Sequence, residues 1–177
     1  VAVDGTIEDF VDHMNRKAAE LGCQNTHFTN PVGIHNENHY STPYDMALIM
    51  KACLEYDTYL EISQAPKHTV PATDMSGPRE IYNTNALVST WNHSGYIYDK
   101  CIAGKTGNTD EAGRCLIAAA EDNDEILISV IIGSGPMPVP GEEDLKQGHF
   151  RESKRLLEYG FNNFHRVTIT KDSEPVG

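Results

Sequence analysis

Hydrophobic residues recur along the chain with two different periods. Over residues 6–21 they return every three or four positions, which predicts an amphipathic helix. Thr6 is expected to cap this helix, with Asp9 as the acidic partner of a capping box. Gly22 is placed to end it, because glycine readily adopts the left-handed conformation of a helix C-cap. The predicted apolar face comprises Ile7, Phe10, Val11, Met14, Ala18 and Leu21.

Two further helices are predicted by cap residues and apolar spacing. After a loop over residues 25–45, a helix should begin near Pro43, with Ser41 or Thr42 as its cap, and run to about Glu55. A final helix is expected over Phe150–Phe161. The second helix should bury Tyr44, Ala47, Leu48 and Leu54, and the last should place Phe150, Ser153, Leu157 and Phe161 on one side.

The pattern changes to strands in the second half of the chain. Residues 56–95 are interrupted by proline and glycine, so short strands or loops are expected there, with a turn near 83–87. Residues 97–106, 114–120 and 125–132 predict an antiparallel meander. Residues 133–144 read as a loop. Helices beside an antiparallel sheet give an α+β fold, an antiparallel sheet flanked by helices.

Composition excludes several classes of protein. The 177 residues contain 14 Lys and Arg against 26 Asp and Glu, a net charge of −12, which argues against nucleic-acid binding. No apolar run has the length of a transmembrane helix. The four cysteines form no Cys-x-x-Cys pair, so free thiols or an isolated disulfide are expected. His35 and His39 lie in a loop, so neither a metal site nor a cofactor is predicted.

The segment "CIAGKTGNTDEAGRCLIAAA" carries the candidate chemistry. If it forms an edge strand beside a cleft, Lys105 supplies a cation that stabilises developing negative charge, and the Thr106 hydroxyl can bind a substrate carboxylate. Gly107 lets a peptide lie against the strand as an added strand, and the N–H of Asn108 can serve as half of an oxyanion hole. The alternative is a surface lysine in an ordinary β-turn.

Four stretches of the sequence together resemble one family, the serine D-alanyl-D-alanine carboxypeptidases or low-molecular-mass penicillin-binding proteins. They are "FVDHMNRKAAELGCQNTHFTNPVGIHNENHYSTPYDMALI", "IYNTNALV", "GKTGNTDEAGRCLIAAA" and "HFRESKRLLEYGF". The resemblance implies a transpeptidase-like domain over residues 1–165, with the start of a truncated C-terminal β-domain or linker over 166–177. It also implies acyl transfer by a serine on peptidoglycan stem peptides, binding of β-lactam antibiotics, and an extracytoplasmic, cell-wall-facing location in a bacterium.

The family's nucleophile motif is absent from these residues. None of the nine serines is followed by Lys three positions on or by Asn two positions on, which the family's Ser-x-x-Lys and Ser-x-Asn motifs require. In the family both motifs precede the helix that opens this chain. The sequence is therefore expected to be a fragment that is inactive alone. Such a fragment is expected to form dimers or to exchange strands through the surface that truncation exposes.

Two positions depart from the family pattern, and two alternative functions stay open. Asn108 stands where His or Tyr is common, and His149 stands where an Arg binds the substrate's terminal carboxylate. Because histidine is charged only near or below its pKa of about 6.5, carboxylate binding is expected to be weaker or pH-dependent. One alternative is a non-catalytic module that binds peptidoglycan peptides or a partner. The other, less favoured, is a β-lactamase-related hydrolase.

Overall fold

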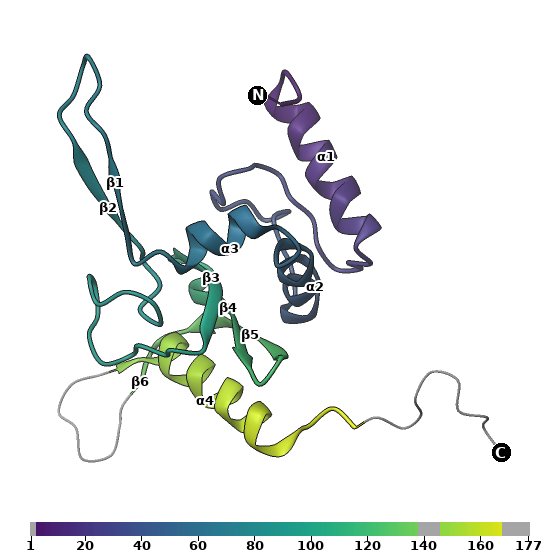
Figure 1. The fold of residues 1–177 in the computed structure, drawn as a ribbon. Helices are drawn as coiled ribbons and strands as arrows, with labels where there is room; N and C mark the ends of the chain where they lie inside the picture. The colour runs from purple at the N-terminus through teal and green to yellow at the C-terminus, as the bar shows by residue number, and fades with distance from the viewer. Residues whose placement is uncertain (1–2, 138–145, 168–177) are drawn as a thin grey trace, which may run out of the picture.

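The computed structural model describes residues 3–137 and 146–167 (Figure 1). Its helices are α1 (Ile7–Glu20), α2 (Pro43–Cys53), α3 (Asp57–Gln64) and α4 (Gly148–Asn163). Its strands are β1 (Lys67–Val70), β2 (Arg79–Tyr82), β3 (Cys101–Thr109), β4 (Gly113–Asp122), β5 (Glu125–Ser134), β6 (Pro136–Met137) and β7 (Lys146–Gln147). The segment expected to begin a C-terminal β-domain lies mostly outside the described residues. No helix in the described ranges is long and apolar enough to cross a bilayer.

Helix α1 begins and ends as the sequence predicts. The Thr6 hydroxyl oxygen accepts a hydrogen bond from the Asp9 backbone N–H at 3.1 Å. The Asp9 carboxylate accepts from the Thr6 hydroxyl at 2.6 Å, whereas a full capping box would use the Thr6 backbone N–H. At the other end Gly22 has a φ of +89°, and the N–H groups of Gly22 and Cys23 bond back to carbonyls of the last turn. This Schellman arrangement is the reason for a glycine there.

Helix α2 begins at Pro43, as predicted, and ends at Cys53, two residues before the predicted end. One expectation about its buried face is wrong, because Tyr44 is 72% exposed while its neighbour Asp45 is only 1% exposed. The Asp45 carboxylate accepts hydrogen bonds from the Asn25 N–H and the Thr26 hydroxyl, each at 2.7 Å. The Thr26 hydrogen bond, with the backbone bonds beside it, holds the pKa of Asp45 below its ordinary value.

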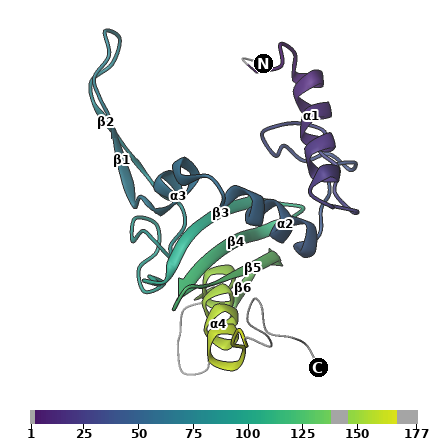
Figure 2. The ribbon, with the colours of Figure 1, turned by 45° about the vertical axis from the view of Figure 1, so that its right-hand side comes forward.

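Residues 57–82 contain a helix that the sequence pattern does not reveal, followed by a hairpin. Helix α3 has no side-chain N-cap bond, and its inward positions are few. Strands β1 and β2 pair in antiparallel register from Lys67 opposite Tyr82 to Val70 opposite Arg79. Figures 1 and 2 both show this hairpin standing away from the body of the molecule, on the side opposite α1.

The predicted meander is confirmed as an antiparallel sheet in the order β3-β4-β5. Helix α4 covers one face, and α2 and α3 cover the other (Figure 2). A register shift between Cys101 and Ala103 sends these residues to opposite faces, although residues two apart normally share one. Each face consequently has its own hydrophobic cluster: Cys101 lies in the one beneath α4, and Ala103 in the one beneath α2.

Helix α4 buries the residues that its spacing predicts. Phe150, Ser153, Leu157 and Phe161 are all buried. The Ser153 hydroxyl meets the Ser129 hydroxyl of β5 at 2.5 Å, so the polar groups of this interface satisfy one another. The first turn of α4 lies beside the carboxyl-terminal half of β3, and this junction forms one end of the candidate site.

Candidate substrate-binding site

A pocket of about 510 Å³ lies where β3, the start of β4 and the start of α4 meet. Its lining includes all five residues singled out from the sequence, namely Lys105, Thr106, Gly107, Asn108 and His149. Four of them are consecutive, so their proximity to one another needs no tertiary structure. His149 is separated from them by about forty positions in the chain, and only the packing of α4 on the sheet brings it to the pocket.

Alternation along β3 divides the candidate residues between the two faces of the sheet. Thr106 pairs with the buried Leu116 of the cluster beneath α4, and Lys105 pairs with Ile117 of the opposite cluster. The Lys105 ammonium donates a hydrogen bond to the Thr106 carbonyl. Lys105 also lines a second pocket of about 320 Å³ beneath the β1–β2 hairpin. The lysine thus stands between two cavities along one strand.

The Asn-x-Asn segment holds the chain against β3. The Asn83 side chain donates to the carbonyls of Ser63 and Ala65 at 3.0 and 3.1 Å, and its oxygen accepts from the Asn85 N–H at 2.9 Å. Asn85 is buried and approaches β3 so closely that a Cβ on Gly104 would lie 2.4 Å from its side-chain nitrogen. The motif therefore has a structural role, and it requires a glycine in the facing strand.

Thr84, between the two asparagines, extends this connection into the site. Its hydroxyl lies 2.6 Å from the Thr106 hydroxyl, so one donates to the other. Both threonines line the 510 Å³ pocket. The Thr106 hydroxyl is consequently oriented before any ligand arrives, which lowers the entropic cost of using it.

His149 is buried in the pocket wall and neutral near pH 7. It is 6% exposed, its ring packs 4.0 Å from that of Phe150, and its Nδ1 atom has no hydrogen-bond partner among the described residues. Burial, with smaller contributions from the nearby Arg114 and His93, lowers its pKa from 6.5 to about 4. The titration near 6.5 expected from the sequence is therefore displaced to more acidic pH.

Arg114 is a pocket residue that the sequence analysis did not single out. It pairs with Asn108 across the β3–β4 ladder, and its Nη1 donates to the side-chain oxygen of Gln147, just before α4. The Gln147 N–H in turn donates to the Tyr96 hydroxyl at 2.9 Å. The short turn between β3 and β4 fixes the register that places Arg114 opposite Asn108. Aligning the two predicted strands across this turn would therefore have identified Arg114 from the sequence.

The site offers cations, hydroxyls and amides, and its chemistry suits an anionic peptide.

Within residues 3–137 and 146–167, no group of three His, Cys, Asp or Glu side chains could hold a metal ion. His39, considered as a zinc ligand, instead accepts a hydrogen bond from the Thr29 N–H at 3.2 Å. The four cysteines are free thiols.

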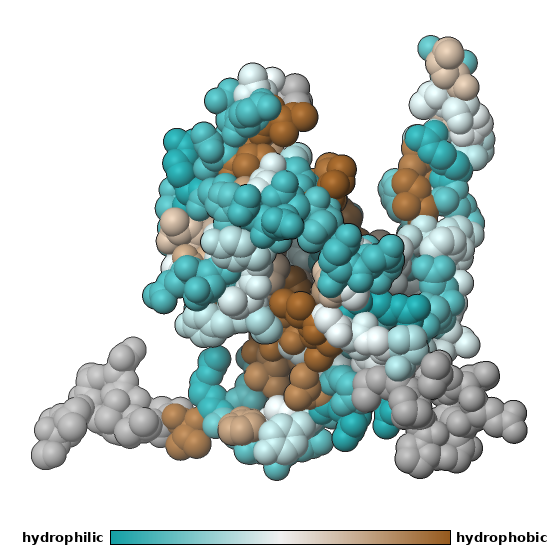
Figure 3. Space-filling model, turned by 180° about the vertical axis from the view of Figure 1, so that it is seen from behind, coloured by the Kyte–Doolittle hydropathy of each residue, from teal (hydrophilic) through white to brown (hydrophobic). Residues whose placement is uncertain are grey.

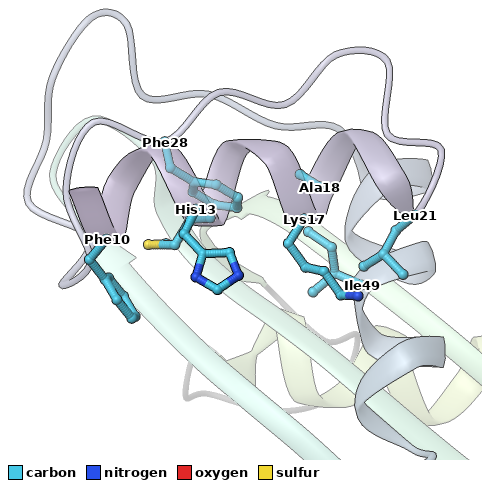
Figure 4. Close-up of a pocket in the computed structure, with 8 residues that line it drawn as sticks. Phe10, His13, Lys17, Ala18, Leu21, Phe28 and Ile49 are labelled. Atoms are coloured by element: carbon cyan, nitrogen blue, oxygen red, sulfur yellow. The ribbon is translucent and has the colours of Figure 1, made fainter. Parts of the chain in front are cut away.

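A third cavity has a different character. About 310 Å³ in volume, it lies along α1 and is lined mainly by apolar side chains (Figure 4). Figure 4 shows Phe10 and Ala18 from α1 and its C-cap residue Leu21, with Phe28 from the following loop and Ile49 from α2. His13 and Lys17 are its only ionisable lining residues in the described chain. It lacks the hydroxyl and amide groups of the first pocket, so it is not a catalytic candidate.

Comparison with known proteins gives one consistent result. A family model described as D-alanyl-D-alanine carboxypeptidase matches residues 2–135. The carboxypeptidase DacF of Bacillus subtilis is 30% identical over 174 residues, covering 98% of this chain and 40% of the relative. DacA of Escherichia coli is 31% identical, covering 97% of this chain and 39% of the relative. The chain thus spans about two fifths of the length of these curated relatives.

Solved structures agree with the sequence matches. A Streptomyces DD-transpeptidase superposes with a TM-score of 0.71 at 28% identity, over 88% of this chain and 55% of that one. A D-alanyl-D-alanine carboxypeptidase from Mycobacterium tuberculosis superposes with a TM-score of 0.73 at 24% identity, over 95% of this chain and 59% of that one, and shows the fold alone. The α+β fold expected from the sequence is confirmed.

Proposed function

Since the chain belongs to the D-alanyl-D-alanine carboxypeptidase family, we propose that it forms the Lys-Thr-Gly wall of the substrate cleft in a serine-type enzyme that trims peptidoglycan stem peptides. The observation that supports this most directly is the pocket that gathers Lys105, Thr106, Gly107, Asn108 and His149. A peptide ending in D-Ala-D-Ala has a reacting carbonyl and a free carboxylate. The pocket offers both cations and hydrogen-bond donors for these two groups.

Each residue has a role that its chemistry supports. Strand β3 is an edge of the β3-β4-β5 sheet, so a substrate backbone can pair with it, and Gly107 leaves room for close approach. The Lys105 ammonium stabilises negative charge as it develops on the carbonyl oxygen, and the Asn108 N–H donates to that oxygen. The Thr106 hydroxyl, already oriented by Thr84, hydrogen-bonds the terminal carboxylate.

The reaction itself needs a serine that these residues do not supply. In the proposed reaction a serine oxygen attacks the carbonyl carbon of the penultimate D-Ala and forms an ester with it. The peptide C–N bond breaks, and the terminal D-Ala leaves after its nitrogen gains a proton. Water then cleaves the ester and regenerates the serine. The absence of Ser-x-x-Lys, and the two-fifths coverage of relatives, support a nucleophile outside these 177 residues and an isolated chain that is inactive. A β-lactam would be trapped at the ester stage.

The proposed setting is the outer side of the bacterial cytoplasmic membrane, facing the cell wall. The relatives from Bacillus subtilis and Escherichia coli are bacterial carboxypeptidases. A stem peptide is an extracytoplasmic substrate, so an enzyme acting on it must be exported.

Self-association is the expected behaviour of the isolated chain. The apolar cavity along α1 and the exposed Ile126 and Ile132 of β5 leave hydrophobic surface open to solvent. Figure 3 shows hydrophobic side chains gathered down the middle of the face seen from behind. Sedimentation equilibrium tests this, with dimers or larger species expected and a monomer at every concentration as the contrary result.

Intact mass spectrometry with a penicillin tests the proposed activity. The 177-residue chain should gain nothing, and the product of its gene extended upstream should gain one penicillin. In that longer protein Lys105→Ala should slow acylation by roughly 100-fold or more, since it removes a charge aimed at the developing oxyanion. Lys51→Ala, at an exposed site on α2, is the control. An upstream sequence without Ser-x-x-Lys would instead favour the non-catalytic binding module.

A further inference from the structure

The 510 Å³ pocket has a charge opposite to that of the whole chain. The 177 residues carry a net charge of −12, yet no Asp or Glu is among the described residues that line this pocket. Lys105 and Arg114 both line it. The negative charge of the whole chain repels anions at long range, whereas the two cations attract an anion that reaches the pocket. This arrangement is expected of a specific anion-binding site.

The two cations occupy different parts of the pocket. In the β3–β4 ladder Arg114 is opposite Asn108, and Lys105 is opposite Ile117. Successive residues of a strand point to opposite faces, so Arg114 and Asn108 share the α4 face while Lys105 lies on the other. Lys105 can serve the reacting carbonyl while Arg114 serves a second anionic group of the same ligand.

Within the described residues, Arg114 is oriented by a neutral side chain. Its Nη1 donates to the uncharged side-chain oxygen of Gln147, and the Gln147 N–H is held by the Tyr96 hydroxyl at 2.9 Å. In the described part of the chain no carboxylate comes within salt-bridge distance of Arg114. Among the described residues the guanidinium is thus oriented by a neutral partner rather than by a carboxylate, and it has further N–H donors in a planar fork that fits a carboxylate.

Two other features of the pocket favour an anion beside Arg114. His149 is 6% exposed, and its Nδ1 atom lacks a partner among the described residues, so an incoming oxygen can satisfy it. The 16-residue helix α4 begins at Gly148 beside it, and its N-cap residue Gln147 makes no side-chain cap bond. The unsatisfied N–H groups of a first helical turn attract negative charge.

We propose that Arg114, oriented by Gln147, determines specificity by binding the free C-terminal carboxylate of the peptide. This inference rests on the proposed function and deepens it, because it names the residue that distinguishes a chain end from an internal peptide bond. A guanidinium–carboxylate pair is short and often bidentate, and replacing the carboxylate by a neutral amide removes the charge that makes it strong.

The test is binding, because the isolated chain lacks the nucleophile motif. The full 177-residue chain is titrated by NMR with diacetyl-L-lysyl-D-alanyl-D-alanine and separately with its C-terminal amide. The unaltered chain should bind the acid about 10-fold or more tightly than the amide, as expected for one charge-assisted hydrogen bond. Arg114→Gln should bind acid and amide alike. Arg79→Gln, at an exposed site on β2, should keep the preference.

A second variant, Gln147→Ala, tests the inference if Arg114→Gln does not fold. Gln147→Ala removes the side-chain acceptor but keeps the backbone N–H that bonds Tyr96, so the pocket wall is retained. It should lower the preference for the acid without abolishing it, and full retention in both folded variants would overturn the inference. If Arg114→Gln still prefers the acid, the inference is wrong and the proposed function stands. If the unaltered chain binds neither peptide, the proposed function fails, and the inference fails with it.

Discussion

Burial of a neutral His149 should make the stability of the fold depend on pH. Its pKa falls from 6.5 in an unfolded chain to about 4 in the folded state, because charging the ring would place an uncompensated cation in a buried wall. At a pH between these two pKa values, the histidine is protonated in the unfolded chain but not in the folded chain. Stability from this group is therefore complete above about pH 6.5 and is lost as the pH falls toward about 4.

The size of the effect follows from the displacement of the pKa. A change of one unit corresponds to about 1.4 kcal/mol, so the whole displacement corresponds to roughly 3 kcal/mol. Between about pH 7 and about pH 4.5, roughly 2.5 kcal/mol of it should disappear. Other titrating groups change stability over the same range, so the unaltered chain alone does not isolate this contribution.

Urea unfolding of the chain and of His149→Gln isolates it. Glutamine does not titrate, and its packing cost is the same at every pH, so only the protonation of His149 changes the difference between the two free energies of unfolding. That difference should shift by roughly 2.5 kcal/mol in favour of the variant between about pH 7 and about pH 4.5. A difference that stays constant with pH would refute the reasoning from burial.

Three further predictions test the packing that positions the site, each by urea unfolding against the unaltered chain. Gly104→Ala should destabilise the fold by about 1–3 kcal/mol, since its Cβ would lie 2.4 Å from the Asn85 side-chain nitrogen, and a value near zero would contradict the close approach. Gly160→Ala should cost about 1 kcal/mol less than Gly104→Ala, because the clashing Leu127 methyl lies at the end of a flexible side chain and alanine favours the helix. Leu157→Ala should cost about 2–5 kcal/mol, and a loss below about 1 kcal/mol would mean that α4 packs loosely on the sheet.

Some elements of this fold are strongly determined by local sequence. Thr6 and Gly22 mark the ends of α1 because capping depends on hydrogen bonds within a few residues. The meander follows from alternating runs joined by short turns, and the inward face of α4 follows from its 3.6-residue period. The proximity of Lys105 to Asn108 is simply continuity of the chain.

Other features depend on contacts between distant segments. Tyr44 looks like a core residue, yet Asp45 takes the buried position because a loop twenty residues earlier supplies hydrogen bonds to its carboxylate. Helix α3 has too few buried positions to give a clear helical period of hydrophobic residues in the sequence. Its conformation depends instead on packing against the sheet.

The sequence by itself determined the family, the Lys-Thr-Gly strand and the helices whose caps and periods are local. Only the tertiary structure decided that His149 is neutral and that Arg114 stands beside it as an oriented cation. The physical reason is that protonation and anion binding depend on burial and on nearby charges. Those quantities are set where β4 and α4 meet, about thirty positions apart in the chain.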